Sequence, residues 1–203
     1  MENVEPYNPL DKKNLGVSVA EAMLQRPVSP LPPKDRFAGA GIYAIYYIGE
    51  YAHYEPIATG NREEKWRRPI YVGKAIPKGG RKGGLAFDAP TGNVLYSRLT
   101  EHARSIEESE NLQLSDFFCR FLVVDDIWIP LGESLLISTF RPLWNMVLDG
   151  FGNHDPGGGR KDSQRSVWDM LHPGRSWASK YREGKAEAEI LELIGNYHES
   201  SND

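Results

Sequence analysis

The chain has 203 residues, of which 40% are hydrophobic and 26% are charged, a composition typical of a globular protein that buries a core. It has no apolar run long enough to span a membrane, and its acidic, proline-bearing start lacks a secretory signal pattern, so we expect a cytoplasmic location. The single cysteine, Cys119, cannot form an internal disulfide.

We expect residues 1–36 to form an N-terminal arm. Ser18 and Glu21 make a possible capping box for a short helix. The prolines that follow, beginning at Pro27, impose an extended and semi-rigid path. Two roles are open for this arm: it is a strap on the surface, or it wraps DNA or a second subunit.

Two β-rich segments follow, and they organise the rest of the chain. Residues 41–43 read Gly-Ile-Tyr, and residues 69–74 read Pro-Ile-Tyr-Val-Gly-Lys. Paired as an antiparallel hairpin, they bring Tyr43 and Tyr71 onto one sheet. A third strand is predicted over residues 117–124. The predicted fold is therefore α+β, with a small three-stranded antiparallel sheet flanked by helices.

A helix is predicted over residues 95–106, where apolar side chains recur at helical spacing. Arg98 and His102 lie one turn apart at the edge of its apolar stripe, where both can reach inward toward the sheet. Arg104 points the opposite way and is expected to be a solvated surface charge. A lone helical histidine is usually structural, but His102 stands one turn from an inward-leaning arginine.

The next predicted helix runs from Pro130 to Phe140 and carries Glu133 in the middle of an apolar face. No basic residue lies one helical turn away from this carboxylate. A carboxylate in an apolar setting needs a partner, and a divalent metal ion is the one we predict. The alternative is a solvated glutamate in the first turn, favoured by the helix dipole.

Taken in order, these motifs resemble the GIY-YIG nuclease superfamily over about residues 37–145. The resemblance rests on Gly41-Ile42-Tyr43, on Tyr71-Val72-Gly73, on the Arg98-x-x-x-His102 pair, on Glu133 and on Asn145. Residues 46–49 also spell Tyr-Tyr-Ile-Gly, but they follow Tyr43 on the same predicted strand. The second tyrosine belongs on the neighbouring strand, so Tyr71 is the better match.

The resemblance divides the chain into the arm (1–36), a catalytic core (37–149) and a C-terminal extension (150–203), all in one structural domain.

From Leu31 to Tyr181 the chain looks closest to type II restriction endonucleases of this superfamily that cut CCGCGG. This implies Mg²⁺-dependent cleavage of double-stranded DNA that leaves 5′-phosphate and 3′-hydroxyl ends. A palindromic target implies a homodimer, and restriction implies a cognate DNA methyltransferase. The alternatives are a homing or repair nuclease of the superfamily, or a binding module without catalysis.

The resemblance also assigns roles to the site residues. Glu133 holds Mg²⁺, Arg98 stabilises charge on the phosphate, and Asn145 supports the site structurally. Tyr43 is the general base, with Tyr71 and His102 positioning the water or sharing its proton. Because an unperturbed tyrosine has a pKa of about 10, Tyr43 needs a nearby cation, and Lys74 or the metal-bound phosphate site could serve. His102 has the more convenient pKa, so the base is open between Tyr43 and His102.

Basic residues concentrate where DNA contact is expected. Residues 60–104 hold ten Lys or Arg against four Asp or Glu, a balance that fits a phosphate-facing groove better than an ordinary solvated surface. After residue 150, a turn-rich loop leads into basic residues interleaved with tryptophans, Arg175 among them. The DNA-contact candidates are Lys74, Lys78, Arg81, Lys82, Asn153, His154, Arg160, Lys161 and Arg165.

Overall fold

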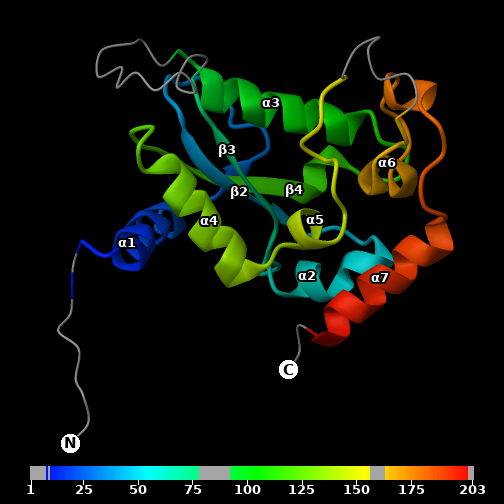
Figure 1. The fold of residues 1–203 in the computed structure, drawn as a ribbon, viewed down its shortest axis with the longest axis horizontal. Helices are drawn as coiled ribbons and strands as arrows, with labels where there is room; N and C mark the ends of the chain where they lie inside the picture. Colours follow the sequence, from blue (N-terminus) through cyan, green and yellow to red (C-terminus); the bar gives the residue numbers. More distant parts are fainter. Residues whose placement is uncertain (1–7, 9, 78–91, 156–162, 201–203) are drawn as a thin grey trace, which may run out of the picture.

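A computed structural model describes residues 8, 10–77, 92–155 and 163–200. It has three layers: one antiparallel sheet with helices packed on both of its faces (Figure 1). Within the described residues, every helix is too short or too polar to cross a bilayer.

The strands are β1 (Ser29–Pro30), β2 (Gly41–Tyr47), β3 (Pro69–Ala75) and β4 (Phe117–Val123). The α-helices are α1 (Lys12–Leu24), α2 (Glu55–Thr59), α3 (Val94–Glu107), α4 (Ile129–Phe140), α5 (Leu143–Met146), α6 (Val167–Leu171) and α7 (Glu187–Ser200). Short 3₁₀ turns occupy Ala52–Tyr54, Leu114–Asp116 and Ala178–Lys180.

The sheet has the strand order β1-β4-β2-β3, with every neighbouring pair antiparallel. The predicted hairpin is confirmed, because β2 pairs with β3 and Tyr43 lies opposite Gly73. The antiparallel sheet flanked by helices is also confirmed, but the expected count of three strands was wrong. The fourth strand, β1, pairs Ser29 with Cys119 at the edge of β4. The sequence did not reveal β1, because two residues are too few to show an alternating pattern. Proline lacks a backbone N–H, and an edge strand tolerates it because no strand on the outer side needs that donor.

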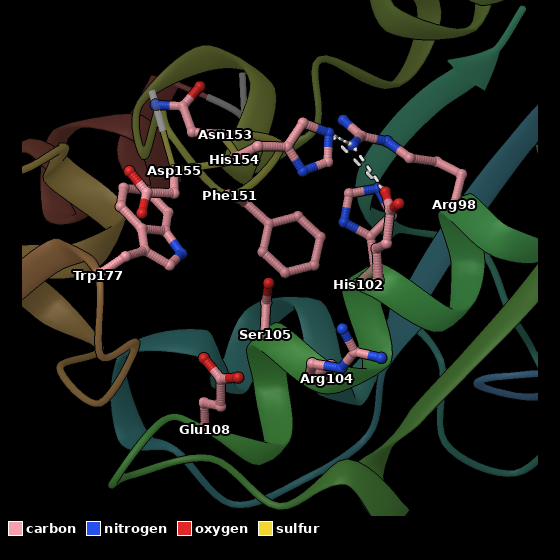
Figure 2. Close-up of a pocket in the computed structure, with 11 residues that line it drawn as sticks. Arg98, His102, Arg104, Ser105, Glu108, Phe151, Asn153, His154, Asp155 and Trp177 are labelled. Atoms are coloured by element: carbon pink, nitrogen blue, oxygen red, sulfur yellow. Dashed lines mark hydrogen bonds and ion pairs between the residues drawn. The ribbon is translucent and has the colours of Figure 1, made fainter. Parts of the chain in front are cut away.

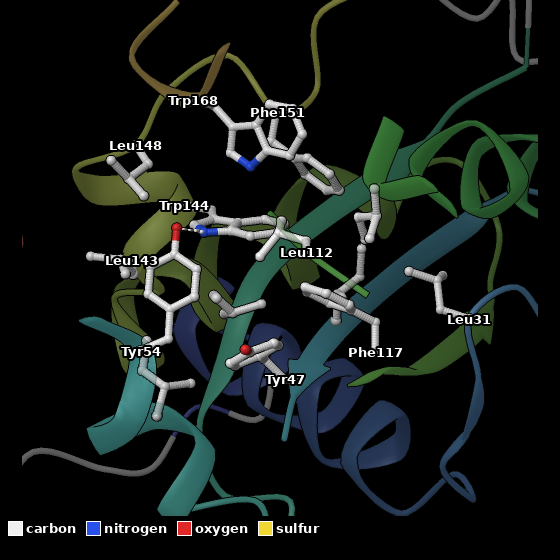
Figure 3. Close-up of a cluster of buried hydrophobic side chains, with 14 of the residues drawn as sticks. Leu31, Tyr47, Tyr54, Leu112, Phe117, Leu143, Trp144, Leu148, Phe151 and Trp168 are labelled. Atoms are coloured by element: carbon white, nitrogen blue, oxygen red, sulfur yellow. Dashed lines mark hydrogen bonds between the residues drawn. The ribbon is translucent and has the colours of Figure 1, made fainter. Parts of the chain in front are cut away.

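The central strand β2 divides its side chains between two cores. All seven of its residues are buried, and successive side chains of a strand point to opposite faces. Tyr43 and Ile45 enter the larger core with α3, α5, α6 and α7, part of which is seen in Figure 3. Ile42 and Tyr46 enter a second core with α1 and α4. Tyr46 therefore lies on the other face of the sheet from Tyr43, whereas Tyr47 shares the face and the larger core of Tyr43 but stands on the same strand.

Helix α1 joins the folded body although it falls inside the segment expected to be an arm. Met23 is completely buried in the second core. Gly132 of α4 allows the close approach of the two helices, because a Cβ there would lie 2.7 Å from a methyl group of Val19. One face of residues 12–24 is thus packed against α4.

The C-terminal residues also belong to the main fold. Trp168 of α6 and Ile190 of α7 are buried in the same core as Tyr43 and Trp144. Residues 163–200 therefore complete the layer that covers one face of the sheet, as Figure 1 shows for α6 and α7.

Truncating Met23 tests whether α1 is part of the fold. Met23→Ala should lower the free energy of unfolding by about 2–5 kcal/mol, because it leaves a cavity between α1 and the sheet. Val17→Ala, at an exposed position of the same helix, should change it by about 0.5 kcal/mol or less. Urea denaturation measures both, and equal small effects would show that α1 is not packed.

Candidate active site

Two tyrosines from neighbouring strands lie on the same face of the sheet. Tyr43 of β2 and Tyr71 of β3 have ring centroids 6.2 Å apart. The ring of Tyr43 lies across the backbone of β3 at Gly73, where a Cβ would lie 2.6 Å from its Cζ atom. Only glycine at position 73 leaves room for the ring, which explains physically why glycine follows Tyr71-Val72 here.

Helix α3 places His102 against Tyr43. The Tyr43 hydroxyl and His102 Nε2 are 2.5 Å apart, and both side chains are buried. Phe151, from the loop after α5, stacks on the imidazole with ring centroids 4.5 Å apart. The helix was expected to turn His102 inward and Arg104 outward, and Arg104 is indeed exposed.

Burial fixes which member of this pair carries the proton. Burial, and next the neighbouring Tyr71, raises the pKa of Tyr43 well above 10. Burial, followed by the charge of Arg98, lowers the pKa of His102 well below 6.5. At neutral pH the Tyr43 hydroxyl therefore donates its hydrogen bond to the Nε2 of a neutral imidazole. Tyr43 is not a tyrosinate in the resting protein.

Arg98 is held at the mouth of the site by the loop that carries Phe151. One of its Nη atoms donates to the carbonyl oxygen of Gly152 at 2.8 Å, and the other to Glu101 at 3.2 Å and to the imidazole of His154. Figure 2 shows His154 beside Arg98, with Phe151 next to His102. The side chain of Arg98 is 20% exposed, so the guanidinium is anchored and still reachable.

Glu133 has a basic partner that helix periodicity could not reveal. Its Oε2 atom lies 2.6 Å from the ammonium of Lys74, which stands on β3. No basic residue lies one helical turn from Glu133, as expected, but a basic neighbour comes from the sheet instead of the helix. Lys74 is not the cation beside Tyr43; Arg98 has that place, and its charge partly offsets the rise in the pKa of Tyr43 caused by burial.

These groups open onto one cleft of about 1070 Å³. Tyr71, Lys74, Arg98, Glu133 and His154 all line it. Tyr43 and His102 do not line this cleft, and both are almost fully buried. The cleft thus presents two cations, the carboxylates of Glu101 and Glu133, and a phenol next to a buried Tyr–His pair.

Asn145 of α5 lies at the edge of the sheet below the site. Its side-chain amide accepts a hydrogen bond from the backbone nitrogen of Val72 and donates one to its carbonyl oxygen, both at 2.8 Å. The amide thereby takes the place of a further strand and holds β3 between Tyr71 and Gly73.

The predicted DNA contacts fall into three groups. Asn153 and His154 are exposed beside the cleft. Arg165 is half-buried and donates to Ser179 of its own chain. The remaining candidates other than Lys74 lie outside the described residues: Lys78, Arg81, Lys82, Arg160 and Lys161.

The sequence did not reveal the part played by the loop after α5. Phe151 and Gly152 contact His102 and Arg98, but the composition of residues 150–160 indicated only a turn-rich loop. Arg175 seemed a DNA contact because tryptophans flank it, whereas it is 2% exposed and bound to Asp169. A buried partner for an arginine leaves no signal in a local pattern.

The family comparison agrees with this geometry. The family model described as the Eco29kI GIY-YIG domain matches residues 35–198. No curated protein matches the chain by sequence. The match includes every residue of the site described above and extends through α6 into α7. The chain therefore belongs to the Eco29kI GIY-YIG domain family, a family of restriction endonucleases.

Proposed function

We propose that this GIY-YIG nuclease is a type II enzyme that cuts double-stranded DNA at a specific site and leaves 5′-phosphate and 3′-hydroxyl ends. The observation that carries the proposal is the convergence of Tyr71, Arg98, Glu133 and Lys74 on one cleft beside the Tyr43–His102 pair. A phosphodiester in this cleft meets cations for its charge and a carboxylate for a metal ion. Binding alone does not require that combination.

The Tyr43–His102 hydrogen bond supports a route for the proton of the attacking water. A hydroxyl both accepts and donates, so Tyr43 can take a proton from a water that enters beside Tyr71 while passing its own to His102 Nε2. Burial keeps Tyr43 as a neutral phenol, and a neutral imidazole is a stronger base than a neutral phenol. His102 is therefore the final proton acceptor in this proposal, and Tyr43 is the group between it and the water.

Arg98 and Lys74 supply positive charge where the phosphate becomes more negative in the transition state. Donors that are already oriented stabilise that charge without reorganisation. Arg98 meets this condition because Gly152 and Glu101 hold its guanidinium. The ammonium of Lys74, beside Glu133, lines the same cleft as Arg98.

Glu133 would hold the Mg²⁺ ion. Among the described residues, no three His, Cys, Asp or Glu side chains gather as a preformed metal cage. Mg²⁺ commonly keeps several waters and binds through one or two carboxylates together with substrate phosphates, which fits a single carboxylate in a DNA cleft. When bound, the ion supplies Lewis-acid stabilisation of the phosphate and the leaving oxygen. When the ion binds, the Glu133 carboxylate would have to bind both the ion and Lys74, or its ion pair with Lys74 would have to break.

The partner is double-stranded DNA, and the target proposed from the family resemblance is a GC-rich palindrome such as CCGCGG. One site cannot readily cut two antiparallel strands at once, so we propose a homodimer with one site for each strand. A cell that carries such an enzyme needs a cognate DNA methyltransferase to protect its own sites. The basic balance of residues 60–104 supports the DNA assignment.

Removing the carboxylate tests the metal assignment. Glu133→Gln should lower the cleavage rate by about 100-fold or more, because Lewis-acid stabilisation is worth several kcal/mol. Glu107→Gln, at an exposed position near the end of α3, should cleave like the unmodified protein. Plasmid cleavage in Mg²⁺ with an EDTA control measures both variants, and full activity of Glu133→Gln would refute the assignment.

The pH dependence of the single-turnover rate tests the proton acceptor. His102 accepts a proton only in its neutral form, which is present above its lowered pKa, so the rate should already be level at and above about pH 6.5. If Tyr43 acted as a tyrosinate, the rate would rise about tenfold per pH unit through pH 9, because its pKa is raised. A rising line with that slope would assign the base to Tyr43 instead.

A further inference from the structure

Arg175 is a buried arginine outside the cleft, and nothing in the proposed chemistry uses it directly. Its Nε and one Nη atom donate to the two carboxylate oxygens of Asp169 at 2.7 and 2.8 Å. The guanidinium lies between the rings of Trp168 and Trp177, 4.6 Å from each centroid. This bidentate and stacked setting fixes both the position and the plane of the guanidinium.

The remaining hydrogen bonds of Arg175 all go to the loop after α5. Its Nη atoms donate to the carbonyl oxygens of Gly150, Phe151 and Asn153 at 3.0, 3.2 and 3.3 Å. This path of the loop requires glycine at position 150, because its φ is +101° and a Cβ there would lie 2.0 Å from Ser166. Three carbonyl groups within four residues are therefore bound to one buried cation.

The same loop holds the groups of the active site on its other side. The carbonyl of Gly152, which Arg175 does not bind, accepts the hydrogen bond from Arg98 at 2.8 Å. Phe151 stacks on His102, and His154 contacts Arg98. The loop thus stands between two arginines, with Arg175 in the core and Arg98 at the cleft.

We infer that Arg175 is a positioning residue that sets the guanidinium of Arg98 and the ring of His102 through the backbone of residues 150–154. It touches neither DNA nor the reacting atoms. This inference rests on the proposed function, in which Arg98 stabilises the phosphate and His102 accepts the proton. Lysine at position 175 keeps the charge beside Asp169, but its single ammonium cannot reproduce the planar set of donors.

Arg175→Lys should lower the single-turnover rate at saturating DNA by about 10- to 100-fold, because small displacements of catalytic groups cost that much. The affinity for DNA in EDTA should stay within about twofold, since Arg175 is buried away from the cleft. Arg104→Lys, at an exposed position of α3, is the matched control and should leave rate and affinity unchanged. Equal rates for Arg175→Lys and the unmodified protein would overturn the inference.

A double-mutant cycle separates positioning from general loss of structure. Because Arg175 acts partly through Arg98, Arg175→Lys should cost less rate in an Arg98→Lys background than it costs alone. Costs that multiply would overturn the inference. Gly152→Ala gives a second check on the loop, because its Cβ would lie 2.9 Å from the Tyr71 hydroxyl and 3.2 Å from Arg98 Nη2 without touching Arg175. Gly152→Ala should lower the single-turnover cleavage rate and leave the affinity for DNA unchanged. An unchanged cleavage rate would show that the loop does not position Arg98.

NMR of the arginine side chains keeps the inference testable even if the protein cuts no DNA. The Arg98 Nε–H signal, identified by its loss in Arg98→Lys, should move in Arg175→Lys and stay in place in Arg104→Lys. An unmoved signal in a folded Arg175→Lys variant would overturn the inference, whatever the cleavage assay shows. Absence of cleavage by the unmodified protein, with the signal moved as expected, would instead refute the proposed function.

Discussion

The hydrogen bond between Tyr43 and His102 is the interaction on which the site depends. A polar pair in a core must satisfy itself, because an unpaired hydroxyl or imidazole there costs free energy. The pair forms only when β2 and β3 keep their register, since Gly73 must lie under the Tyr43 ring. It also requires α3 to present His102 to the sheet and Phe151 to cover the imidazole. The packing of the hydrophobic core therefore determines the position of the Tyr43–His102 pair.

A second tyrosine–histidine pair shows the same principle in a structural role. Tyr54 hydrogen-bonds His172 Nε2, whose other ring nitrogen contacts Asn111 at 2.7 Å. Trp144 donates to the same tyrosine hydroxyl, and burial lowers the pKa of His172 to about 3. This pair joins the segment after β2, the α3–β4 connection and the C-terminal residues. The neutral form of a buried histidine therefore recurs in this fold, once in the interior and once beside the cleft.

The sequence predicts the parts of the site whose signals are local. The hairpin follows from β-branched and aromatic residues between glycines, and helical spacing places Arg98 and His102 on the inner edge of α3. Ion pairs between distant elements carry no such signal. The lysine beside Glu133 stands on β3, 59 residues earlier. Arg175 and its partner Asp169 are only six residues apart, but helical spacing does not pair them, because α6 ends between them at Leu171. A basic residue between tryptophans indicates a DNA surface as readily as a buried cation, and only packing distinguishes the two.

The protonation state of His102 tests the central claim most directly. The imidazole nitrogens of the folded protein can be observed by ¹⁵N NMR from about pH 5.5 to about pH 7.5, with His102→Gln to identify their signals. The account predicts a neutral ring with its proton on Nδ1 throughout this range, and an Nε2 signal that shifts in Tyr43→Phe. A ring that gains a proton near pH 6.5, or an Nε2 signal indifferent to Tyr43→Phe, would contradict it.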